Sequence, residues 1–174
     1  MKINVSLSSD SIEDAIKKLE AYSKRIEKNT ELLRKRIAHE LVEEIQRGFD
    51  ESMYDYQILK GGSQEAEKPQ VNVSCNEDGT VVIASGQEAV FVEFGAGVYF
   101  NTAVGSSPHP NGSQLGLTIG SYGSNGAKKV WGYYDDDGTL HLTRGTPAQM
   151  PMYNATQEVC RRITDIAKEI FSND

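Results

Sequence analysis

Residues 10–48 have the sequence DSIEDAIKKLEAYSKRIEKNTELLRKRIAHELVEEIQRG, and the spacing of their apolar side chains decides the fold class. Asp10, followed three positions later by Glu13, predicts an N-cap with an acidic partner in the first turn. From there, apolar residues recur at spacings that mix three and four, which predicts one helix with a single apolar stripe. The stripe consists of Ile12, Ile16, Leu19, Ile26, Leu33, Ile37, Leu41 and Ile45.

A continuous helix over this range would be about 60 Å long, which is longer than a domain of this size measures across. Either the helix breaks near Asn29-Thr30 to form a helical hairpin, or its far end projects and packs on another subunit. The spacing alone does not decide between the two. Residues 11–50 contain nine Lys or Arg and nine Asp or Glu, so the solvated face is neutral, unlike that of a DNA-binding helix.

The composition is typical of one domain with its own core. The chain has 174 residues, of which 38% are hydrophobic, and its net charge of −7 argues against a nucleic-acid binder, which needs a basic face. Cys75 and Cys160 match no metal or redox spacing, so we expect buried, reduced bystanders. We also expect a soluble protein without membrane association, because no apolar run approaches the roughly 20 residues that span a bilayer.

The remaining elements follow a long connection at 49–69. Alternating residues predict a hairpin over 71–84, a strand or short helix over 89–94, strands over 130–134 and 139–143, and a helix over 152–171. This order predicts an α+β fold in which an antiparallel sheet of hairpins packs against the long N-terminal helix, or helical hairpin, and a C-terminal helix. We expect one domain over 1–174 with a long flexible loop at about 101–129.

The stretch VWGYYDDDGTLHLTRG (130–145) invites a calcium or active-site interpretation. With Gly138 as the glycine of an EF-hand loop, the first ligand position is Tyr133 and the twelfth is Arg144, so the loop fails. Asp137-Gly138 between alternating strands instead favours a hairpin with aspartates at its tip. A small carboxylate hydrolase or metal-binding domain that uses Asp135 to Asp137 with His141 stays a remote alternative. We predict no catalytic residue, no cofactor and no metal.

Two stretches carry a resemblance: AVFVEFGAGVY (89–99) and LTRGTPAQMPMYNATQEV (142–159). Together they resemble the tail-completion or head–tail joining (minor capsid) proteins of long-tailed bacteriophages, which have a V-E-F-G-T-G segment and a later R-G-x-P-A-x-P-F-M-Y-x-A segment. The matching residues are Val92, Glu93, Phe94, Gly95, Gly97, Arg144, Gly145, Pro147, Ala148, Met152, Tyr153 and Ala155. The chain departs from the pattern at Ala96 and at Met150-Pro151, where the family has threonine and a proline followed by an aromatic residue.

The resemblance implies a non-enzymatic virion protein that forms a ring, a hexamer in the family, at the head-proximal end of the tail. Its expected partners are the head connector or stopper protein and the tail-tube or tail-terminator protein. DNA would pass through without specific binding, and the protein would lie in the neck of the virion after assembly in the host cytoplasm. A tail terminator, which caps tail polymerisation, is the alternative within this class.

The candidate interface includes the matching residues together with Phe91 and three side chains of the glycine-rich segment. Ordering a flexible segment costs about 1 to 2 kcal/mol per residue, and residues 101–129 contain few apolar side chains to offset that cost. We therefore expect this segment to gain order only on a neighbouring subunit, with Leu115, Leu117 and Ile119 at the contact.

Overall fold

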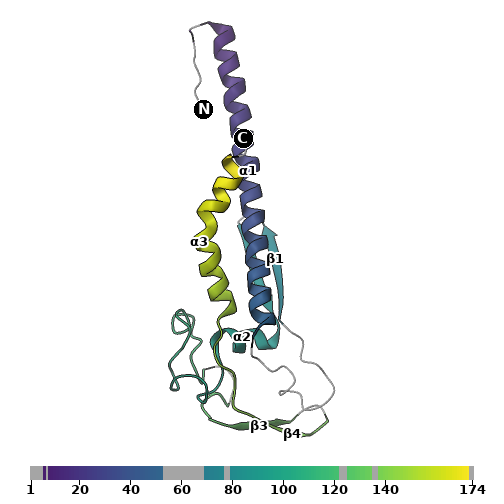
Figure 1. Cartoon of the computed structure of the whole chain (residues 1–174), viewed down its shortest axis with the longest axis vertical. Coiled ribbons are helices and arrows are strands. Elements are labelled where there is room, and N and C mark those ends of the chain that lie inside the picture. The colour runs from purple at the N-terminus through teal and green to yellow at the C-terminus, as the bar shows by residue number, and fades with distance from the viewer. Residues whose placement is uncertain are drawn as a thin grey trace.

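The computed structural model describes residues 6, 8–52, 69–76, 79–121, 125–134 and 137–172. Figure 1 shows an elongated molecule in which helix α1 follows the long axis. The elements confirm the predicted α+β class; they are α1 (Ser9–Asp50), β1 (Gln70–Asn76), β2 (Gly79–Ser85), α2 (Gln87–Phe94), β3 (Trp131–Tyr134), β4 (Leu140–Thr143) and α3 (Pro151–Ser172).

Helix α1 is continuous over 42 residues, so it does not form the helical hairpin. Asn29, at the proposed break, is buried within the helix, and its Nδ2 donates to the carbonyl of Ile170 at 3.5 Å. The N-cap is Ser8, whose hydroxyl accepts the N–H of Ser11 at 3.4 Å, so the prediction of Asp10 as the cap is wrong. Asp10 lies in the first turn instead, where its charge complements the helix dipole.

Helix α3 packs along the C-terminal half of α1 and ends beside Asn29. Between the helices, Arg162 lies 2.8 Å from Glu40, and Arg36 of α1 lies 2.7 Å from the other oxygen of the same carboxylate. These two arginines compensate the cost of burying the Glu40 charge. Residues 9–28 of α1 extend past the end of α3, as Figure 1 shows, and we refer to them as the projecting segment.

The β1–β2 hairpin confirms the predicted alternation and packs on α1. Val82 and Ala84 turn towards the helix, whereas Val81 and Ile83, on the other face of β2, are exposed. The side chain of Gln46 closes the junction by accepting the N–H of Val71 at 3.2 Å. The core then forms where α1, α2 and α3 meet, from Ile45, Phe49, Ala89, Val92 and Ala155.

The second hairpin does not extend the first sheet. Strands β3 and β4 pair antiparallel with each other, from Trp131 opposite Thr143 to Tyr134 opposite Leu140, and make a separate two-stranded sheet. It lies at the end of the molecule opposite the start of α1 (Figure 1). A hairpin with two open edges is marginally stable by itself, so further contacts must support it.

Within the described residues, no helix combines the length and the apolar character that a membrane span requires.

Candidate functional site

The two stretches that carry the family resemblance fold against each other. Ala96 and Thr146 form an antiparallel bridge, with N–H to carbonyl distances of 2.8 and 2.9 Å. The N–H of Gln149 also donates to the carbonyl of Val92 at 2.9 Å. Segments about 50 residues apart in the sequence thus form one unit. We call the unit formed by residues 89–101, 143–153 and His109 the joint.

Asn101 holds both sides of the joint. Its Nδ2 donates to the carbonyls of Gly97 and Thr146, both at 2.9 Å, and lies 3.3 Å from the carbonyl of Ala96. Its Oδ1 accepts the N–H of Ala148 at 3.1 Å. One amide side chain therefore satisfies backbone groups on both segments, a task that suits its paired donor and acceptor.

Two glycines let the segments approach this closely. Gly145 has φ of +85°, and a Cβ there would lie 1.9 Å from the carbonyl oxygen of Ala96. Gly97 has φ of +76°, and a Cβ there would lie 2.7 Å from the ring of Trp131. Both positions need glycine for their backbone conformation and for the space around them. The ring of Trp131 also connects β3 to the joint.

Glu93 caps helix α3 from outside that helix. Its Oε2 accepts the N–H of Met152 at 2.8 Å, and its Oε1 accepts the N–H of Tyr153 at 3.0 Å. These N–H groups belong to the first turn, where a helix has no internal acceptors for them. The carboxylate is 5% exposed, and its negative charge complements the helix dipole. The glutamate of one motif thus fixes the start of the helix in the other.

His109 is the third partner of this carboxylate. Its Nε2 lies 3.0 Å from Glu93 Oε1, and its Nδ1 accepts the N–H of Asn111 at 3.0 Å. Because Nδ1 is an acceptor, the ring hydrogen is on Nε2, which donates to the carboxylate. The ring centroid lies 4.5 Å from that of Phe94 and 5.3 Å from that of Tyr153, and the imidazole is buried. His109 thereby anchors the glycine-rich segment to the joint.

Met150 marks the departure from the family pattern. It has φ of +57°, the only positive φ outside glycine among the described residues, and lies directly before the first residue of α3. A proline, which is locked near −65°, cannot adopt this conformation. Met150, which stands where the resembling family has proline, therefore has a backbone conformation that proline would not permit. Pro151 takes the first helical position, which suits it.

The joint presents aromatic and cationic side chains to solvent. Tyr99 and Phe100 follow the glycine turn, are each about half exposed, and lie edge to face with centroids 4.8 Å apart. The guanidinium of Arg144 lies 4.9 Å from the centroid of the Tyr99 ring, a cation–π contact. Beyond them, Leu140 and Leu142 on β4 are also exposed. Tyr99, Phe100 and Arg144 thus form one exposed cluster.

The described part of residues 101–129 makes contacts within its own chain, and its gain of order on a neighbouring subunit stays a prediction. Ile119 is 1% exposed, and its N–H and carbonyl bond with Ser106 and Gly105, each at 2.8 Å. Ile119 is therefore a core residue of its own subunit, whereas Leu117 is half-buried and Leu115 is 62% exposed. Hydrogen bonds between backbone groups close these turns.

This difference in burial predicts a contrast between two serine variants. Ile119→Ser should lower the free energy of unfolding by about 2 to 4 kcal/mol, because it removes a buried side chain and leaves a hydroxyl in its place. Leu115→Ser should change it by less than about 0.5 kcal/mol. Urea unfolding followed by circular dichroism measures both, and equal effects of the two substitutions would contradict the packing.

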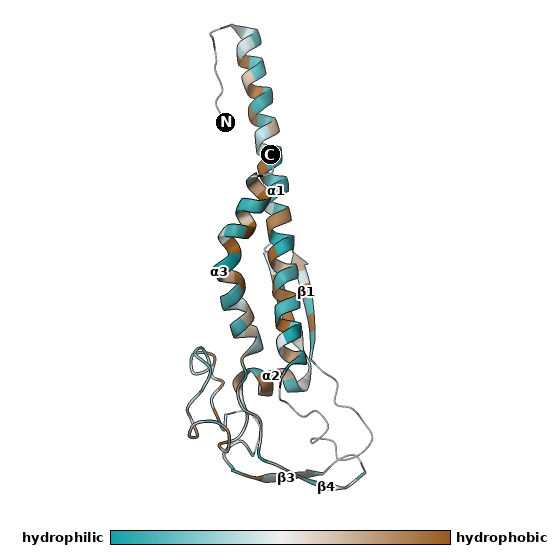
Figure 2. Cartoon of the chain, in the orientation of Figure 1, coloured by the Kyte–Doolittle hydropathy of each residue, from teal (hydrophilic) through white to brown (hydrophobic). Residues whose placement is uncertain are grey.

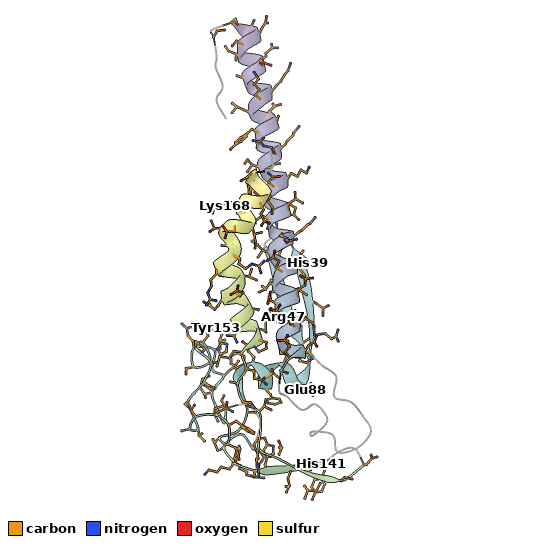
Figure 3. The ribbon with its side chains drawn as sticks, in the orientation of Figure 1. His39, Arg47, Glu88, His141, Tyr153 and Lys168 are labelled. Atoms are coloured by element: carbon orange, nitrogen blue, oxygen red, sulfur yellow. The ribbon has the colours of Figure 1, made fainter. Side chains whose placement is uncertain are left out.

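The residues behind the catalytic and metal interpretations are described only in part. Asp135 and Asp136 lie outside the described residues, and His141 is a half-buried residue on β4, near the end of the molecule in Figure 3. Across the described ranges, no group of three His, Cys, Asp or Glu side chains could hold a metal ion. Cys75 and Cys160 are exposed, so their predicted burial is wrong. Cys75 lies on the face of β1 that is turned towards α1, beside Ala38 and Val42.

The predicted interface residues divide into two groups. Phe91 and Val92 pack in or against the core, and Glu93, Phe94, Gly95, Gly97, Gly145, Met152 and Tyr153 build the joint. Pro147 and Ala148 are half-buried in the same unit, and Arg144 faces solvent. Asn101 and His109 were not predicted. The signal for them was Glu93 itself, because a carboxylate inside an apolar run requires polar partners.

No protein-family model matches the chain, and comparisons with curated proteins and with solved structures likewise give no match.

Proposed function

We propose that this protein is a non-enzymatic structural protein of a long-tailed bacteriophage, which forms a ring at the head-proximal end of the tail and joins the tail to the head connector. The observation that carries the proposal is the cap on α3. Glu93 of the first resembling segment accepts the N–H groups of Met152 and Tyr153 of the second. The two stretches that carry the resemblance thus act as one structural unit, as expected of a structural signature rather than a catalytic one.

The surface beside the joint supports a role in binding other proteins. Tyr99, Phe100 and Arg144 belong to the residue types that are enriched in protein interfaces. Leu140 and Leu142 on β4 are exposed as well. A ring subunit needs such a surface for the connector or for the tail proteins, and the open edges of β3 and β4 could accept a strand from a partner.

The charge of the chain agrees with passage of DNA without specific binding. The net charge is −7, and residues 51–127 contain eight acidic and two basic side chains. A negative channel repels the phosphate backbone and lets it slide. The protein would act in the virion neck, after assembly with its partners in the host cytoplasm.

Disruption of the gene in the phage that encodes the chain tests the proposal. We expect filled heads and tails of normal length that lie unjoined in electron micrographs, with a loss of infective particles that the intact gene restores. Overlong tails would instead assign the protein as a tail terminator, since unchecked tail-tube growth is the defect of a missing cap. Normal joined particles would contradict both assignments.

A further inference from the structure

Three cations flank one end of the β3–β4 hairpin. Lys128 and Lys129 come directly before the hairpin, and Arg144 directly follows Thr143, the residue that pairs with Trp131 at the start of β3. All three side chains are exposed, and we call them the basic end. The three aspartates of this stretch fall in the connection between the strands, at the other end of the hairpin. A chain with a net charge of −7 thus carries a local positive charge here.

The charges of the basic end are not neutralised by the described part of the chain. None of the three cations forms an ion pair with another described residue. On α3, by contrast, Arg161, Arg162 and Lys168 each pair with a carboxylate, at 3.0, 2.8 and 3.0 Å. An exposed cation attracts an external anion when no neighbouring carboxylate neutralises it. The basic end therefore favours a partner that brings carboxylates of its own.

Arg144 belongs both to the basic end and to the exposed cluster with Tyr99 and Phe100. Its guanidinium lies over the Tyr99 ring, 4.9 Å from the centroid, and the Phe100 ring lies edge to face with that of Tyr99. Contact with a ring face leaves the in-plane N–H donors of the guanidinium available, and no described residue accepts from them. These donors match a carboxylate in two parallel hydrogen bonds. Because the ring already holds the guanidinium, less side-chain entropy is lost on binding.

An acidic protein segment fits these side chains better than a nucleic acid does. Single-stranded nucleic acids need open aromatic faces on which bases stack, whereas Arg144 lies over a face of the Tyr99 ring. Duplex DNA needs a broader basic surface, and the net charge of the chain opposes its approach. Tyr99 and Phe100 are 49% and 50% exposed, so apolar side chains beside the carboxylates of a protein segment could pack on them.

We propose that the basic end and the rings of Tyr99 and Phe100 bind an acidic segment of a partner protein. The carboxylates of this segment pair with the three cations, and its apolar side chains pack on the two rings. The inference rests on the proposed function, which requires the subunit to bind head or tail proteins, and it states the chemistry of one such partner.

Fluorescence anisotropy of a labelled random copolymer of glutamate and tyrosine, titrated with the full chain, tests the proposal. The copolymer offers carboxylates and apolar rings in one chain, so the parent should bind it. Lys128→Glu, Lys129→Glu and Arg144→Glu combined should weaken this binding by about tenfold or more. Tyr99→Ser with Phe100→Ser should weaken it by about threefold or more. A copolymer of lysine and tyrosine should not bind the parent.

Lys17→Glu, Lys24→Glu and Lys28→Glu combined are the matched control. These lysines are exposed on the projecting segment, along which Figure 2 shows hydrophilic residues recurring. The control changes the net charge of the chain by as much as the glutamate variant of the basic end does. At a salt concentration of about 0.15 M, charges more than about 8 Å away are largely screened. The control should therefore bind within about twofold of the parent.

Circular dichroism should show that each variant is folded. If the glutamate variant of the basic end unfolds, Lys128→Gln, Lys129→Gln and Arg144→Gln combined give the same comparison, with an expected weakening of about fivefold. Equal weakening by the basic-end variant and the α1 control would overturn the proposal, and so would a parent that does not bind the glutamate copolymer. Tighter binding of a DNA duplex or of oligothymidine, lost in the basic-end variant, would assign the site to nucleic acid instead.

The outcomes also separate this inference from the proposed function. The binding measurement involves no phage, so its failure would leave a joining role on other surfaces untouched. Normal joined particles after gene disruption would remove the joining role, while binding of the glutamate copolymer would still assign an acidic partner to the basic end.

Discussion

Glu93→Ala is expected to lower the free energy of unfolding by about 3 kcal/mol or more. The substitution removes the acceptor for Met152 N–H, Tyr153 N–H and His109 Nε2–H, all within 3.0 Å of a carboxylate that is 5% exposed. Each buried donor left without an acceptor costs about 1 to 3 kcal/mol, although water entering the vacated space recovers part of the sum. A loss of this size corresponds to a fall in Tm of about 6 to 12 °C for a chain of this length.

Glu88→Ala is the matched control for this measurement. Glu88 is the same residue type in the first turn of the same helix, α2, where its charge contributes only to the helix dipole. Its replacement should cost less than about 1 kcal/mol. Glu93→Gln keeps one carbonyl acceptor but loses the charge, so its Tm should lie between those of Glu93→Ala and Glu88→Ala. Thermal unfolding with equal Tm values for Glu93→Ala and Glu88→Ala would contradict the role of Glu93 as the cap of α3.

Gly145→Ala is expected to separate the two sides of the joint. A Cβ at this position would lie 1.9 Å from the carbonyl oxygen of Ala96, which is held in the bridge to Thr146. The substitution therefore adds a backbone clash to the strain of a left-handed φ of +85°. We expect a loss of about 3 kcal/mol or more, and exposure of the Trp131 ring to quenchers because that ring packs beside both Gly97 and Gly145.

Gly138→Ala is the matched control, because it introduces the backbone strain without the clash. Gly138 has φ of +79°, close to that of Gly145, but a Cβ there meets nothing within 4 Å. Its replacement should cost only about 1 to 2 kcal/mol, the conformational part alone. The difference between the two variants measures the close approach of the segments. If Gly138→Ala is as destabilising as Gly145→Ala, in urea unfolding and in tryptophan quenching, the two segments do not meet as described.

The helices and hairpins were predictable because their patterns are long. The apolar stripe of α1 extends over many helical turns. Within residues 71–84, apolar and polar residues alternate on both sides of a turn. The type and the order of these elements therefore followed from periodicity. Whether α1 continues through Asn29 was not predictable. A polar pair such as Asn29-Thr30 within a helical pattern is compatible with a break, and it is equally compatible with a continuous helix in which the amide bonds to the end of α3. The run at 89–94 is too short to distinguish strand from helix, and it is helical.

The joint was predictable only in part. The motif residues were identified from the sequence. The partners of Glu93, however, are backbone N–H groups about 60 residues away, and almost any residue type supplies such a group, so the sequence does not reveal them. His109 lies between two prolines, and nothing in that local sequence indicates its bond to Glu93. Composition does not show the contacts of the glycine-rich segment either, because they involve single side chains such as Asn101, which donates to Thr146, and Ile119, which is buried.

The most direct test of the proposed role is the position of the protein in mature particles. Gold-labelled antibodies raised against the purified chain should bind virions of the encoding phage at the junction of head and tail, and particles lacking the gene should bind none. Virions that contain the chain only along the tail tube or at the distal tip would contradict a joining role. Purified virions that contain none of it would contradict the assignment as a virion protein.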